Sequence, residues 1–179
     1  ENHGIYVPDF YGRSDRVAWE AFIEKHNPTP AIEELIGLRE ERLIRMLREQ
    51  EPLFDGVTDL IQRLAKRYPL GLASGSIHRV IDEVLAMQNL RSYFKDITSS
   101  EDVSVPKPSP EIFLLSAKRL GVPPEKCCVI EDTVNGIKAA LAAGMTAVAI
   151  TNTFDASSLF DAGADTVCGN YSAIHSQFI

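Results

Sequence analysis

The sequence has little of several residue types, and each shortage excludes a class of protein. Its 179 residues include only three cysteines and no apolar run long enough to cross a membrane. Three cysteines, two of them adjacent, fit reduced thiols better than a disulfide framework, so we expect Cys127, Cys128 and Cys168 to be small core residues. No signal-peptide pattern opens the chain. We therefore expect a cytoplasmic protein that does not bind membranes.

Basic residues are also scarce relative to acidic ones. The 18 Lys and Arg against 25 Asp and Glu leave a net charge of -7, which argues against a nucleic-acid backbone as partner. A local cationic pocket for a small anion is still compatible with that charge. With 45% hydrophobic residues, the chain can bury one core with a small appendage, and we expect a monomer.

Residues 53–179 alternate short apolar runs with amphipathic stretches. Strand-length apolar runs occur at 70–73, 93–98, 127–130, 146–150 and 165–168, with helical patterns between them. Strands that alternate with helices at short intervals are typical of a parallel sheet with helices on both faces. The sequence therefore predicts an α/β protein with a Rossmann-like, doubly wound parallel sheet.

Residues 1–52 have a different pattern. Two amphipathic helices are expected there, separated by the Pro-rich residues 27–30, and no strand pattern is present. These residues predict a small helical unit beside the α/β core of residues 53–179. Arg13 and Arg16, near the start of the first helix, are candidates for binding an anionic substrate, whereas arginines along a helix more often pair with acids on a solvated face.

Two adjacent carboxylates, Glu131 and Asp132, follow the apolar run at 127–130 directly. Ligands bind at the carboxyl edge of such sheets, and neighbouring carboxylates repel unless one is protonated or a cation lies between them. Mg²⁺ resolves the repulsion because it takes oxygen ligands and often sits between carboxylates and a phosphate. The alternative is an ordinary helix-capping acid with a solvated neighbour.

Two further polar segments follow predicted strands. Ser74-Gly75-Ser76 comes after the run at 70–73, with Ser76 expected to cap the next helix, and this places Ser74 beside a helix N-terminus that favours a phosphate oxygen. Plain turn and capping chemistry is the alternative. Lys107 is flanked by two prolines, which stiffen its loop, although most single lysines are solvated surface charges.

These motifs, in this order and with helices between them, resemble a known superfamily. Ser74 in LASGS, Lys107 in VPKPSPEIF and Glu131-Asp132 in VIEDTVNGIKAALAAG look like the second, third and fourth motifs of the haloacid dehalogenase-like hydrolases. The chain is most similar to the branch with β-phosphoglucomutase and small sugar-phosphate phosphatases, which carry a helical cap before the second motif. One departure is Pro106, which stands where a glycine is common.

The resemblance implies Mg²⁺-dependent phosphoryl transfer to and from an aspartate, with a small phosphorylated metabolite as substrate. Residues 1–52 would form the cap that selects the substrate. The roles implied for the candidate residues are metal binding by Asp132 with Glu131 beside it, phosphate binding by Ser74 and the Gly75-Ser76 backbone, and neutralisation of charge by Lys107.

The family's first motif, an Asp-x-Asp on the central strand, has no match in this sequence. That motif supplies the nucleophile, so the chain alone is expected to be inactive. We expect the sequence to begin after this strand. Loss of a central parallel strand would leave two inner strand edges unpaired and a cavity between the helix layers.

Several alternatives to a phosphatase stay open. A β-phosphoglucomutase-type isomerase would share the whole site, and a dehalogenase would share the fold without needing Mg²⁺. The Glu131-Asp132 pair argues against a dehalogenase. A binding module without catalytic activity is favoured only if the first strand is truly absent.

Overall fold

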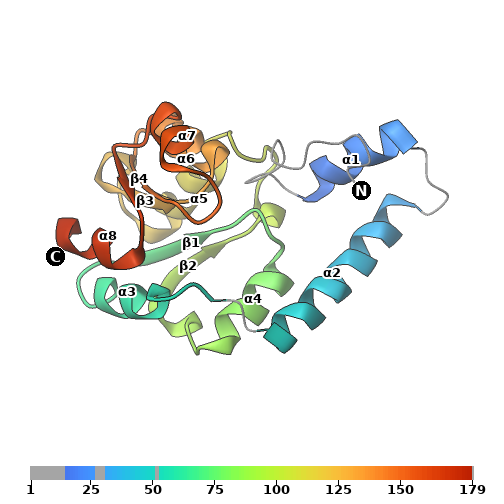
Figure 1. Cartoon of the computed structure of the whole chain (residues 1–179), viewed down its shortest axis with the longest axis horizontal. Coiled ribbons are helices and arrows are strands. Elements are labelled where there is room, and N and C mark those ends of the chain that lie inside the picture. Colours follow the sequence, from blue (N-terminus) through green and yellow to red (C-terminus); the bar gives the residue numbers. More distant parts are fainter. Residues whose placement is uncertain (1–14, 27–30, 51–52, 179) are drawn as a thin grey trace.

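The structure is a computed structural model that describes residues 15–26, 31–50 and 53–178 (Figure 1). Its elements alternate between helix and strand from residue 57 onward. In chain order they are α1 (Asp15–His26), α2 (Ile32–Gln50), α3 (Val57–Leu64), β1 (Leu70–Ala73), α4 (His78–Met87), β2 (Phe94–Thr98), α5 (Glu111–Leu120), β3 (Cys128–Glu131), α6 (Val134–Ala142), β4 (Thr146–Ile150), α7 (Ala156–Asp161), β5 (Thr166–Cys168) and α8 (Tyr171–Phe178). Short 3₁₀ turns lie at Arg91–Tyr93, Ser100–Asp102 and Pro124–Lys126.

All strand pairs are parallel, as the alternating pattern predicts, but the strands form two sheets instead of one. One sheet pairs β1 with β2, and the other has the order β3-β4-β5. Within the described chain, β1 pairs only with β2 and β3 pairs only with β4. The edge strands β1 and β3 lie on either side of a gap between the two sheets, and no described strand fills this gap.

The pattern of β4 explains why helices cover both faces of its sheet. Ala147 and Ala149 pack into one core with residues of α5, α6 and α7, while Val148 and Ile150 pack into another with residues of α3 and α8. Successive side chains point to opposite faces of a strand, so a strand that is apolar throughout is buried on both sides. Figure 1 shows α5, α6 and α7 on one side of the strands and α3 and α8 on the other. The predicted doubly wound α/β class is therefore confirmed.

The third core joins the β1-β2 sheet to α4. Ile81 and Leu85 of α4 pack with Ile97 of β2, and the partly buried Ile61 of α3 and Leu72 of β1 complete the cluster. This packing fixes the start of α4 near the carboxyl ends of β1 and β2. The segment between β1 and α4 is therefore held at the edge of the sheet where functional side chains are expected.

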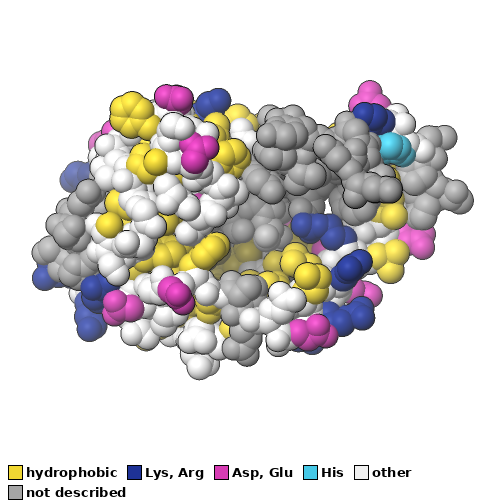
Figure 2. Space-filling model, in the orientation of Figure 1, with side chains coloured by type: hydrophobic (Ala, Val, Ile, Leu, Met, Phe, Trp, Pro, Cys, Tyr) yellow, Lys and Arg dark blue, Asp and Glu magenta, His cyan; other side chains and the backbone are white. Residues whose placement is uncertain are grey.

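Both described elements before residue 51, α1 and α2, are helices (Figure 1). Figure 2 shows acidic and basic side chains interspersed over α2, which agrees with a largely solvated helix. The guanidinium of Arg48 on α2 donates two hydrogen bonds to the Glu83 carboxylate on α4, which links the helical unit to the core. The division into a cap of residues 1–52 and a core of residues 53–179 stays a prediction.

Two local expectations differ from the structure. Cys128 is exposed at the start of β3, contrary to its expected place in the core, because the β1-facing side of β3 has no neighbouring strand. Helix α8 was not expected, yet Ile174 on it is fully buried against β4 and α3 residues.

None of the helices in the described ranges is both long and apolar enough to pass through a membrane.

Candidate active site

Lys107 and Glu131 form a buried ion pair at the carboxyl edge of the strands. The Nζ of Lys107 lies 2.8 Å from Oε1 of Glu131, and the side chains are only 7% and 11% exposed. The same Nζ lies 3.5 Å from the carbonyl oxygen of Ala73 at the end of β1, and 4.7 Å from the centre of the Phe113 ring. Lys107 is therefore not the solvated surface charge that most single lysines are.

The Lys107 loop is held in place by its own backbone contacts. Both carboxylate oxygens of Glu111, in the first turn of α5, accept hydrogen bonds, at 2.9 Å from Ser104 N and 2.8 Å from Val105 N. The N–H of Ser109 closes a turn onto Pro106 O at 3.0 Å. These bonds and the flanking prolines fix the backbone of the Lys107 loop, so little further backbone entropy is lost when Lys107 contacts Glu131.

Glu131 is a carboxylate whose lone pairs are almost all used inside the protein. Its Oε1 accepts from Lys107 Nζ and, at 3.1 Å, from Thr133 Oγ1, and its Oε2 accepts from Asp132 N at 2.9 Å. Burial alone would raise the pKa of Glu131, but the Lys107 charge and these hydrogen bonds outweigh burial and hold its pKa below the ordinary value. Glu131 is therefore a fixed anion.

Asp132 differs from its neighbour because its charge is poorly compensated. Burial raises the pKa of Asp132, a hydrogen bond from Thr153 Oγ1 opposes that rise, and the nearby Glu131 charge adds to it. A divalent cation beside Asp132 would relieve both the burial cost and the repulsion. The described residues contain no cluster of three or more Asp, Glu, His or Cys side chains able to hold a metal. Asp132 thus fits one oxygen ligand of Mg²⁺.

The start of α6 is shaped around Glu131. Thr133 caps this helix, with its Oγ1 accepting from Gly136 N at 3.0 Å while it also donates to Glu131. A Cβ added to Gly136 would lie 1.6 Å from Oε1 of Glu131. Sequence reasoning gave Thr133 and Gly136 no role in the site. The signal was the Glu-Asp-Thr-x-x-Gly spacing, in which only a residue without a side chain leaves room for the carboxylate.

Ser74, Gly75 and Ser76 form the turn between β1 and α4. The hydroxyl of Ser74 accepts from Ser76 N at 3.1 Å, and Ser74 N donates to Thr98 O at 3.0 Å. Ser74 directly follows Ala73, whose carbonyl faces Lys107. The expected capping of α4 by Ser76 is wrong, because Ile77 is the capping residue and no side chain of that position accepts a hydrogen bond. The role of the turn in phosphate binding stays a prediction.

The two candidate arginines cannot be placed in the site. Arg13 lies outside the described residues, and of Arg16, on α1, only the backbone is described. Asn152 and Tyr171 are additions that sequence reasoning missed. Asn152 Nδ2 donates to Tyr171 Oη at 2.7 Å, and both side chains line the cavity that Asp132 also lines.

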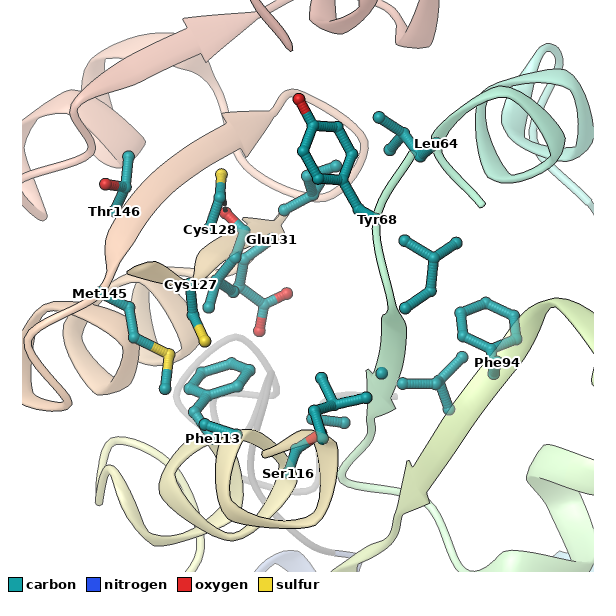
Figure 3. Close-up of a pocket in the computed structure, with 18 of the residues that line it drawn as sticks. Leu64, Tyr68, Phe94, Phe113, Ser116, Cys127, Cys128, Glu131, Met145 and Thr146 are labelled. Carbon is teal, nitrogen blue, oxygen red and sulfur yellow. Dashed lines mark hydrogen bonds between the residues drawn. The ribbon is translucent and has the colours of Figure 1, made fainter. Parts of the chain in front are cut away.

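A cavity of about 790 Å³ separates β1 from β3 and has the Lys107, Glu131 and Asp132 side chains at one end. Its long walls are strand edges, Leu70–Ala73 on one side and residues 127–132 on the other, and α3 and α5 supply apolar side chains above and below. Figure 3 shows the Glu131 carboxylate and the Phe113 ring directed into the space between β3 and β1. The cavity therefore has the form of a slot along the two unpaired strand edges.

Comparison with known proteins agrees with this geometry. A family model described as haloacid dehalogenase-like hydrolase matches residues 5–144. The fructose-1-phosphate phosphatase YqaB of Escherichia coli (strain K12) is 40% identical over 103 residues, which cover 58% of this chain and 54% of that protein. Hexitol phosphatase B of the same strain is 36% identical over 147 residues, covering 80% of this chain and 66% of that protein. The chain thus spans between about half and two thirds of these relatives.

The fold is also shared with a solved structure. The β-phosphoglucomutase of Clostridium difficile superposes with a TM-score of 0.79 over 95% of this chain and 79% of that protein. At 23% identity this likeness concerns the fold alone. The resemblance to haloacid dehalogenase-like hydrolases, and to their phosphatase and β-phosphoglucomutase relatives, is confirmed.

The space around Gly136 yields a test of the ion pair. We expect Gly136→Ala to lower the free energy of unfolding by about 3 kcal/mol, because the added methyl group displaces Glu131 from Lys107 and leaves a buried charge unpaired. Gly37→Ala on α2 is the matched control, since no atom lies within 4 Å of its added Cβ, and it should stabilise by about 0.5 to 1 kcal/mol. Urea unfolding of both variants measures the difference. Equal effects would show that Glu131 is not held as described.

Proposed function

Because the chain belongs to the haloacid dehalogenase-like hydrolase family, we propose that the whole protein is a phosphatase that acts on a small phosphorylated metabolite. The observation that carries this proposal is the cluster of Lys107, Glu131 and Asp132 at the carboxyl edge of the strands. The names of the related phosphatases support a phosphorylated sugar or sugar alcohol as the substrate class.

The chain's own residues suit the binding of a phosphoryl group. Lys107 presents a compact positive charge, held rigidly, that can neutralise charge developing on the transferring group. The Ser74 hydroxyl and the Gly75 N–H can donate hydrogen bonds just beyond the Ala73 carbonyl that Lys107 approaches. Ser76 N donates to Ser74 Oγ and would exchange that bond for one to a phosphate oxygen. Asp132 would hold Mg²⁺, with Glu131 behind it as a fixed neighbouring anion. A bound Mg²⁺ supplies Lewis-acid polarisation of a phosphoryl oxygen.

We further propose that one additional parallel strand fills the slot between β1 and β3 in the whole protein. The free strand edges support this. Cys127 O accepts from Thr146 N of β4 at 3.1 Å, so the backbone groups of Cys128 and Ile130, one residue out of phase, face the slot. By the same alternation, Ser74 N bonds to Thr98 O and leaves the groups of Ala73 on the slot side.

A strand in this slot would end beside Lys107 and Asp132. An aspartate at its carboxyl end could then attack the phosphorus, which breaks the bond to the leaving oxygen and forms an aspartyl-phosphate that water hydrolyses. The amino-acid sequence contains no Asp-x-Asp to serve this role from within. The cap formed by residues 1–52 would cover the site and select the substrate.

Phosphate release from sugar phosphates by the complete protein tests the function. We expect hydrolysis that requires Mg²⁺ and stops on chelation, and we expect Asp132→Asn to lower turnover about 100-fold or more because it weakens the metal site. Release of phosphate distinguishes a phosphatase from an isomerase, which returns a phosphorylated product. Activity that does not depend on Mg²⁺, or an Asp132→Asn variant with unchanged Mg²⁺ dependence, would refute the metal assignment.

The buried ion pair allows catalysis to be separated from stability at Lys107. Lys107→Met leaves the Glu131 charge buried and unpaired, so we expect a loss of about 3 to 5 kcal/mol in stability as well as of activity. The double variant Lys107→Met, Glu131→Gln removes both charges at similar volume and should regain most of the stability. If Lys107 acts on the phosphoryl group, turnover stays about 100-fold low in the double variant. Recovery of activity together with stability would make Lys107 structural.

Hydrogen exchange tests for the additional strand by comparing neighbouring N–H groups within β1 and within β3. If the slot is filled in the complete protein, the backbone N–H groups of Ala73 and Ile130, which face it, should exchange as slowly as those of Leu72 and Val129, which face the existing neighbours. In the 179-residue chain alone the first two should exchange much faster than the second two. Fast exchange of Ala73 and Ile130 in the complete protein would exclude a strand at this position.

A further inference from the structure

Two loops at the carboxyl edge of the β1-β2 sheet are bound to each other through their backbones. Residues 74–77 connect β1 to α4, and residues 99–102 follow β2. Ser100 N donates to Ser76 O at 3.1 Å, immediately beyond the last ladder bond from Ser74 N to Thr98 O at 3.0 Å. The turn proposed to bind phosphate is therefore supported by the second loop, which has no role in the mechanism described above.

The second loop also completes the N-terminus of α4. The capping residue of that helix, Ile77, has no side-chain acceptor, so its first N–H groups need partners from elsewhere. Oε2 of Glu101 accepts from His78 N at 2.7 Å, and Oδ2 of Asp102 lies 2.8 Å from His78 Nε2. Two adjacent carboxylates from another part of the chain thus hold the first residue of the helix by its backbone and its side chain.

Asp102 is itself fixed in position. Its Oδ2 accepts from Ser99 N at 2.8 Å, and its Oδ1 accepts from Arg119 Nη2 at 3.1 Å, which connects it to α5. Burial opposes ionisation, but the Arg119 and Ser99 hydrogen bonds outweigh it and lower the pKa of Asp102 to about 2. The Ser99 hydroxyl accepts from Glu101 N at 3.0 Å, so Glu101 extends from an ordered turn. Residues 99–102 therefore form a rigid support for His78.

We infer that Glu101 and Asp102 are positioning residues that fix the Ser74–Ser76 turn for phosphate binding. The inference rests on the proposed function, because it assigns these carboxylates to the same site. Glu101 takes the His78 N–H and Ser100 supports Ser76, so the turn keeps its shape before any ligand arrives. Neither carboxylate is placed in contact with the substrate, and their negative charge makes direct phosphate binding unfavourable.

Inhibition by inorganic phosphate and sugar-phosphate turnover in the complete protein test this role. Glu101→Ala removes the support of α4, and we expect KM and the inhibition constant for phosphate to rise about tenfold, which is the value of one hydrogen bond to a charged acceptor. The value of kcat should change less, because Lys107 and Asp132 are untouched. Glu101→Gln keeps an oxygen acceptor for His78 N and should restore phosphate inhibition to within about threefold of the wild type.

Asp165→Ala is the matched control. Asp165 is also an exposed acid whose carboxylate accepts from a backbone N–H, that of Ala147 at 2.8 Å, but it lies at the opposite, amino edge of the β3-β4-β5 sheet. It should lower stability without altering the inhibition constant for phosphate. An unchanged constant in Glu101→Ala, or tighter phosphate binding, would overturn the inference while leaving the proposed function intact. If the wild-type protein binds no phosphate and hydrolyses no phosphate ester, the proposed function and the inference both fail.

Discussion

The buried ion pair between Lys107 and Glu131 is the contact on which the rest of the site depends. Removing either charge from water costs several kcal/mol, and only a closely held partner returns that energy. Three elements are shaped to supply the partner: a proline-flanked loop aims Lys107, β3 delivers Glu131, and the first turn of α6 leaves space at Gly136. A change in any of these would leave a charge buried without compensation.

The interruption of the sheet leaves strand edges and apolar side chains in an unfavourable environment. Parallel sheets are stable when both faces are covered and their inner edges are paired, yet β1 and β3 each present an open edge to the same slot. Large apolar side chains stand exposed along it, with Phe54 at 53% and Tyr68 at 46%. Open edges, apolar walls and an ion pair at one end are complementary to one apolar strand that carries a polar end.

Much of the fold followed from the sequence because its strands are short apolar runs bounded by clear breaks. The predicted strands at 70–73 and 146–150 match the structure to the residue. The strand predicted at 127–130 is displaced by one residue, so Glu131 belongs to β3 itself. This displacement matters, because a strand residue has its backbone fixed by the ladder to β4.

The parts that the sequence did not reveal depend on contacts between distant segments. Serine is a residue type typical of helix caps, which is why Ser76 was expected to cap α4. In the structure Glu101, 23 residues away from His78 in the sequence, accepts the hydrogen bond from His78 N instead. Helix α8 has too few residues for a clear periodic pattern, and only the burial of Ile174 against β4 shows why it forms. The role of Gly136 could not be read from its own conformation, because it is set by the position of Glu131.

The two adjacent carboxylates show how one sequence motif provides two different groups. Glu131 accepts from Lys107, Thr133 and the Asp132 backbone, and these contacts keep it ionised. Asp132 accepts from Thr153 and carries a charge that burial and Glu131 both disfavour. The fixed anion thereby makes its neighbour a stronger site for a cation, since binding relieves a repulsion that the fold maintains. Replacing Glu131 with a neutral residue would remove that repulsion.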